Sequence, residues 1–315
     1  MLRNGLFLFV FFGILCCYSC QSFGPKPDKR IDAQLELAAE YASEEEIKSA
    51  IEAIKARFEK FGAYPDVEKM SDNNTIRFSF ETDAPAERVL KYLTYSAHLE
   101  FYLLHSKSEM LNFITEADAY LKEHDSLEYG PIIRMISDNP MSTGSALFGV
   151  VASDTASLNA HLRNKRVLDF IPPDLGPTKF LWGRSSVNDS IFELYAAATG
   201  SHGRPVIDGS MVTEAGHRLN PIGIDVVTLQ MNAEGSLIWE EMTLQAYQNH
   251  TQIAIVLDGL VVSAPGVNNG PISGGRSEIN GDFTEEEAKE LANNIAAGPI
   301  PRITVLQYSV TPLKD

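Results

Sequence analysis

The sequence predicts an α+β fold, in which helices and strands are mixed without a regular alternation. Two amphipathic helices with capping signals are predicted at residues 43–62 and 284–298. Several apolar or alternating runs are typical of strands, and two of these runs are separated only by Asp258 and Gly259. Because the strands do not follow a strict strand–helix–strand order, an α+β class fits better than a parallel sheet wound by helices.

The helix at residues 43–62 is the first clear element. Ser43 and Glu46 have the spacing of a capping box, and Gly62 follows the last apolar residue of the repeat. The apolar residues recur with a helical period, so they are expected on one face. They are Ile47, Ala50, Ile51, Ile54, Phe58 and Phe61.

A strand, a short helix and a second strand are predicted next. Residues 75–80 alternate between apolar and polar, Pro85 opens a short helix, and residues 97–104 form an apolar strand. The order helix, strand, helix, strand over residues 43–104 fits half of a ferredoxin-like unit.

The middle of the chain is less regular, and the last third is clear again. In the middle, helices are predicted at residues 108–123 and 153–162, and a strand at residues 190–198. Further strands are predicted at residues 222–231, 251–257, 260–265 and 302–310, with helices at residues 232–248 and 284–298.

The glycine-rich stretch at residues 255–284 could hold a phosphate or could simply turn the chain. Asp258 and Gly259 separate two apolar runs by two residues, which predicts a hairpin with a type I′ turn. Gly274 and Gly275 predict a second tight turn. The stretch has neither a Walker loop nor a Rossmann loop between a strand and a helix, so we interpret these four residues as structural.

Composition and residue spacing exclude several classes of function. The chain has 315 residues and a formal net charge of −16, so bulk electrostatics oppose binding to nucleic acid or to anionic lipid. The seven histidines show no HxxxH or HExxH spacing, and no G-x-S-x-G motif is present. We therefore expect no catalytic residues, no metal and no cofactor.

The N-terminus resembles the signal of a bacterial lipoprotein. Arg3 precedes a short apolar run, and the chain's three cysteines, Cys16, Cys17 and Cys20, all lie at this end. We predict a signal peptide at residues 1–19, acylation of Cys20 and a polar tether at residues 20–32. The alternative is an ordinary cleaved signal with incidental cysteines. Either interpretation predicts a location outside the cytoplasm, and the first adds a lipid anchor in the cell envelope.

The C-terminal third resembles SecD, the accessory subunit of the Sec translocon. The resemblance rests on the segment IAIVLDGLVVSAPGVNNGPISGGRSEINGDFTEEEAKELANNIAAGPIP, which has the LDG, SAP, GG and EEA-x-x-LAN motifs of the family in order. Weaker resemblance extends over about residues 31–311. It implies a ferredoxin-like base at residues 33–104 and 275–315, with an inserted α+β head at residues 105–274.

The same resemblance implies a non-enzymatic function in protein export. Exported polypeptide or components of the Sec translocon would be the partners. We expect the membrane-embedded motor of the family to be absent, because the chain ends near the point where the family enters the membrane. An alternative is a membrane-tethered module that binds glycan or an envelope protein without a role in export.

Substitution Cys20→Ala tests the predicted lipid anchor. We expect the variant to lack the acyl mass and to be processed abnormally, because the thiol that would carry the lipid is gone. Mass spectrometry and membrane fractionation measure both effects. Unchanged mass and unchanged membrane retention would remove the anchor from this account.

Overall fold

The computed structural model describes most of the chain after residue 25. The described residues are 26–38, 43–60, 62–70, 74–125, 128–137, 144–185, 188, 190–200, 203–281 and 283–313. The predicted signal peptide and Cys20 therefore lie outside them. No helix in these ranges is long and apolar enough to cross a bilayer.

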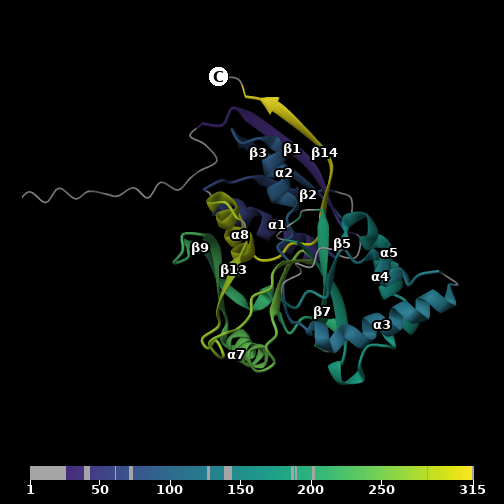
Figure 1. Ribbon diagram of the computed structural model, residues 1–315. Helices are drawn as coiled ribbons and strands as arrows, with labels where there is room; N and C mark the ends of the chain where they lie inside the picture. Colours follow the sequence, from purple (N-terminus) through teal and green to yellow (C-terminus); the bar gives the residue numbers. More distant parts are fainter. Residues whose placement is uncertain are drawn as a thin grey trace, which may run out of the picture.

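Helices and strands are mixed throughout the described chain, which confirms the predicted α+β class (Figure 1). The helices are α1 (Glu44–Glu59), α2 (Ala86–Thr94), α3 (Lys107–His124), α4 (Pro131–Met135), α5 (Thr155–Leu162), α6 (Lys165–Leu168), α7 (Ala233–Gln248) and α8 (Glu285–Ala297). The first seven strands are β1 (Lys29–Leu37), β2 (Asp66–Lys69), β3 (Thr75–Thr82), β4 (Leu99–Leu103), β5 (Phe148–Val151), β6 (Thr178–Arg184) and β7 (Ile191–Ala198). The remaining strands are β8 (Ile207–Asp208), β9 (Val212–Leu219), β10 (Asp225–Met231), β11 (Ile253–Leu257), β12 (Leu260–Ser263), β13 (Arg276–Asn280) and β14 (Ile303–Pro312).

The first sheet has the strand order β14-β1-β3-β2, and all of its pairs are antiparallel. With α1 and α2, it gives the β-α-β-β-α-β order of a ferredoxin-like unit, interrupted by a long insert between α2 and β14. Figure 1 shows β14 beside β1, although the two strands come from opposite ends of the chain. Its core joins alternate residues of β1 and β3 to the apolar faces of α1 and α2. We call this unit the base.

Strand β1 corrects the predicted tether, which extended to residue 32. Residues 29–32 pair with both β14 and β3, and Ile31 is fully buried. The alternation of Ile31, Ala33, Leu35 and Leu37 builds one side of the base. The intervening residues Asp32, Gln34 and Glu36 are polar and less buried, so the sequence carries the alternation of a strand here, and the predicted tether overlooked it.

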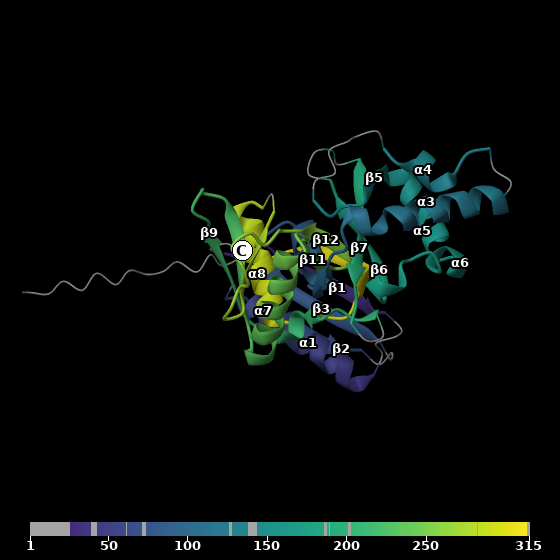
Figure 2. The ribbon, with the colours of Figure 1, turned by 60° about the horizontal axis from the view of Figure 1, so that its bottom comes forward.

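A second sheet has the order β5-β7-β6-β12-β11-β4-β8 among the described residues. One part of it packs with α3, α4, α5 and α6 around a core that includes Met110, Phe113 and Leu194. Figure 2 shows these helices gathered on one side of the molecule, away from α7 and α8. The predicted helix at residues 108–123 corresponds to α3.

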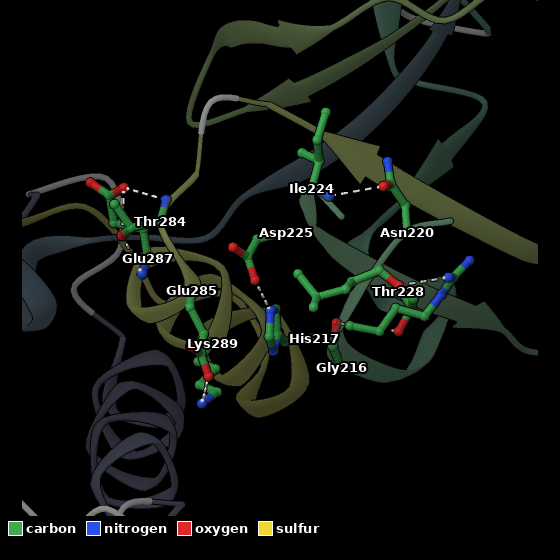
Figure 3. Close-up of polar contacts among 12 residues, drawn as sticks. Gly216, His217, Asn220, Ile224, Asp225, Thr228, Thr284, Glu285, Glu287 and Lys289 are labelled. Carbon is green, nitrogen blue, oxygen red and sulfur yellow. Dashed lines mark hydrogen bonds and ion pairs between the residues drawn. The ribbon is translucent and has the colours of Figure 1, made fainter. Parts of the chain in front are cut away.

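The third sheet has the order β13-β10-β9 and packs with α7 and α8. Val227 and Leu229 of β10 are buried in this core together with Trp239 of α7 and Leu291 of α8. Thr284 and Glu287 form the capping box predicted for α8 (Figure 3). We call the second and third sheets and their helices the head.

Sheet pairing and helix packing place three elements differently from the predicted boundaries. Strand β4, predicted in the base at residues 97–104, pairs with β11 and β8 of the head. Strand β13 and helix α8, predicted in the returning base segment from residue 275, pack with β9 and β10. Only β14 returns to the base sheet, because it takes the edge position that completes the ferredoxin-like order.

The two glycine-containing turns have left-handed backbone geometry. Asp258 and Gly259 have φ values of 51° and 83° and join the antiparallel strands β11 and β12. Positive φ at both central residues is what a type I′ hairpin requires. Gly274 and Gly275, with φ values of 80° and 67°, precede β13.

Substitution Gly275→Ala tests how tightly this second turn is packed. A Cβ atom at Gly275 would lie 2.1 Å from Ser236 Oγ, in addition to the cost of a positive φ. We expect a loss of about 2–4 kcal/mol in the free energy of unfolding, measured by urea denaturation. Gly274→Ala is the matched control, since no atom lies within 4 Å of its Cβ position. It should cost about 1–2 kcal/mol, and an equal loss for both variants would contradict the packing described.

Candidate functional site

A cleft of about 760 Å³ lies beside the three-stranded sheet of the head. Its apolar lining includes Trp239 of α7, Ile253 of β11 and Ile272 of the loop that precedes β13. Its polar lining includes Glu214, Arg218, Gln230 and Glu278, which come from all three strands of the sheet. A partly apolar cleft with charges from several strands is suited to binding a ligand of mixed character.

Trp239 lines this cleft and is 3% exposed. Its indole packs edge-on against Phe101 of β4, with ring centroids 5.5 Å apart. The indole N–H has no acceptor among the described residues. A buried donor without an acceptor is costly to folding, and this nitrogen is shielded from the cleft, so Trp239 contributes apolar surface there.

Two of the four charged residues that line the cleft pair with each other. Arg218 of β9 forms an ion pair with Glu278 of β13 across the sheet. His217 Nε2 lies 2.5 Å from Asp225 Oδ1 (Figure 3). Among the described residues, no three metal-ligating side chains gather into a possible metal site. The geometry of the cleft supports binding of a ligand.

Arg57 of α1 is the main polar contact between base and head. Its guanidinium donates to the carbonyls of Tyr95, Ser96 and Gly298, the last two at 3.1 Å. Two chain segments connect base and head. Residues 95–98 lead from α2 of the base to β4 of the head, and we call them the outgoing crossing; it contains Tyr95 and Ser96. Residues 298–302 lead from α8 of the head back to β14 of the base, and we call them the returning crossing; it begins at Gly298. Arg57 thus holds both connections between base and head.

Burial lowers the pKa of Arg57 to about 10, and the nearby Asp258 carboxylate opposes that shift. The guanidinium is therefore charged at neutral pH, although its side chain is 1% exposed. A buried charge is tolerated when its donors are satisfied and an opposite charge is near. Its Nε atom has no partner among the described residues, so the carbonyl contacts carry most of the compensation.

Asp258 fastens the tip of the β11–β12 hairpin to the outgoing crossing. Its carboxylate accepts from Ser96 Oγ and, at 2.9 Å, from the backbone N–H of His98. Its own N–H donates to the carbonyl of His98 at 2.9 Å. These three contacts tie the hairpin tip to the crossing, although an aspartate at a hairpin tip is commonly solvated.

A second cavity, of about 770 Å³, lies beside the crossings. It is lined by Tyr95, Lys91 of α2, Arg184 of β6, and Phe283 and Asn294 near and on α8. The Oδ1 atom of Asn294 is buried and has no donor among the described residues. Burial raises the pKa of Tyr95, so its phenol stays neutral.

The four predicted turn residues lie at two separate places in this arrangement. Asp258 and Gly259 lie at the crossings, where the head meets the base. Gly274 and Gly275 lie beside the cleft, where Gln230 Nε2 donates to the carbonyl of Gly274 at 2.8 Å. Arg57 was not identified from the sequence. The available signal was its position on the apolar face of a helix, seven residues after Ala50 and three after Ile54.

Comparisons with known proteins identify similar proteins for most of the chain. A family described as "SecDF, P1 head subdomain" matches residues 195–302. "Protein translocase subunit SecD" of Rhodothermus marinus is 28% identical over 301 residues, which covers 82% of this chain and 45% of that protein. The SecD of Sebaldella termitidis is 37% identical over 101 residues, covering 32% of this chain and 24% of that protein. The chain therefore spans less than half the length of these relatives.

Two solved structures share the fold. One is titled "Crystal structure of SecDF in Super-membrane-facing form", with a TM-score of 0.55 and 20% identity, and covers 91% of this chain and 32% of that one. The other is titled "Structure and function of a membrane component SecDF that enhances protein export". It has a TM-score of 0.50 and 20% identity, and covers 88% of this chain and 98% of that one.

Substitution Arg57→Leu tests the connection between base and head. We expect the free energy of unfolding to fall by on the order of 3 kcal/mol, because several buried carbonyls lose their donor. Urea denaturation measures the change. Arg77→Leu is the control, since Arg77 is exposed and pairs only with exposed Glu68, and its cost should stay within about 0.5 kcal/mol. A loss for Arg57→Leu as small as that expected for the control would show that Arg57 does not stabilise the connection between base and head.

Proposed function

This chain carries a SecD-like periplasmic region, and we propose that it assists Sec-dependent protein export by holding exported polypeptide outside the cytoplasm. The proposal is supported by the match of residues 195–302 to the P1 head subdomain and by the ferredoxin-like order of the base that the resemblance implies. The role includes no bond-making step. It places the protein in the cell envelope, with a lipid anchor at Cys20.

The observation that carries the proposal is the cleft beside β9, β10 and β13. Strands β9 and β13 are the two outer strands of their sheet, so each has one edge without a neighbouring strand in that sheet. An extended polypeptide can add to such an edge through backbone hydrogen bonds, which do not depend on its sequence. A protein that handles many exported chains needs this kind of tolerance.

The side chains of the cleft support the same role. Trp239 and Ile272 offer apolar contacts to a peptide in the cleft. Arg218 and Glu278 at the rim already neutralise each other. A rim without a dominant charge neither selects nor rejects strongly charged segments.

Site-specific photo-crosslinking in cells tests the proposal. A photoreactive residue replaces Ile272, which lines the cleft and is 39% exposed. The control is the same residue at Tyr64, which is 77% exposed in the base. We expect exported polypeptides or Sec components to be captured at position 272 and not at position 64.

Capture at both positions alike, or at neither, would count against the cleft as the binding site. Capture of a glycan or of one resident envelope protein at position 272 would favour the alternative function, a tethered binding module without a role in export.

A further inference from the structure

The turn between β9 and β10 exposes three aliphatic side chains on a protruding tip. Leu219 is 59% exposed, Ile222 is 79% exposed and Ile224 is 45% exposed. Residues 219–224, which we call the β9–β10 tip, contain no charged residue, although the chain as a whole has a net charge of −16. Exposed aliphatic residues that cluster without charge mark an interaction surface.

The backbone of this tip satisfies its own hydrogen-bond donors. The Asn220 side chain accepts from the N–H of Ile224 at 2.9 Å (Figure 3). It also accepts from the N–H of Ile222 at 3.1 Å. The N–H of Gly223 donates to the carbonyl of Asn220, and the N–H of Asn220 donates to the carbonyl of Ile224. Because Pro221 has no N–H, every backbone donor from residue 220 to residue 224 is satisfied.

The charged residues that flank the tip are also neutralised. Arg218 pairs with Glu278 and also donates to the carbonyl of Leu219 at 3.2 Å. Asp225, on the other side of the tip, pairs with His217. Moving the tip out of water therefore leaves neither a lone charge nor an unpaired backbone donor close to it, and the side-chain amide N–H groups of Asn220 are its remaining polar donors.

We propose that the β9–β10 tip inserts into the surface of a lipid bilayer composed of zwitterionic lipid. A protein partner could supply acceptors for free backbone N–H groups, whereas the apolar part of a bilayer cannot. A tip whose backbone donors are all satisfied internally therefore suits lipid best. The net charge of −16 opposes approach to anionic lipid, which leaves a neutral surface as the fitting one. This contact is independent of the proposed role in export.

Photo-crosslinking of the full chain in phosphatidylcholine vesicles tests the inference. The photoreactive residue p-benzoylphenylalanine is placed at Ile222 and, in the matched control, at Leu237 of α7, which is 72% exposed. The same aromatic group at both positions cancels its own affinity for lipid. We expect phosphatidylcholine adducts, detected by mass spectrometry, to be several-fold more abundant at position 222.

A second variant separates the turn geometry from simple hydrophobicity. Asn220→Ala keeps all three aliphatic side chains but frees the N–H groups of Ile222 and Ile224. The lipid adduct at position 222 should fall in this background. Equal lipid adducts at positions 222 and 237, none at position 222, or adducts there with protein only would overturn the inference.

Discussion

The fold depends on one buried guanidinium at the junction of base and head. Arg57 projects from the apolar face of α1 and donates to carbonyls of both the outgoing and the returning crossing. The N–H of Ile300 donates to the Ser96 carbonyl at 3.0 Å, which ties the two crossings to each other. Asp258 then adds the tip of a head hairpin to the same cluster. A charge this deeply buried persists only where its surroundings satisfy it, so the cluster favours one arrangement of the two units.

Helix α8 connects this junction to the cleft. Glu286 and Glu290 of α8 each lie 2.6 Å from Arg88 of α2, so the helix is paired with the base. Its apolar face, which includes Ala288 and Leu291, packs in the core of the head with β10. Two chain crossings and the ion pairs of α8 with Arg88 therefore limit how the cleft can move relative to the base.

Local signals in the sequence predicted local structure well. The capping boxes of α1 and α8 are formed as their residue spacing predicts, because such a box needs only residues three apart. The base sheet could not be predicted in the same way. Its order requires β14 to pair with β1 across more than 260 residues, and nothing within either strand specifies that partner. The contacts of Arg57 and Asp258 were missed for the same reason, since their partners are distant in sequence. A charged residue on an apolar helical face was the one local clue.

Native-state hydrogen exchange at the crossings tests most directly whether the Arg57 cluster holds base and head together. The amides of Ile300 and Asp258 donate within this cluster, and that of Ile255 lies in a fully buried head strand. If the cluster fixes the junction, the first two should exchange only through global unfolding, with the same opening free energy as Ile255. Exchange of Ile300 and Asp258 at a free energy several kcal/mol below that of Ile255 would mean that the crossings open on their own, and it would contradict the account.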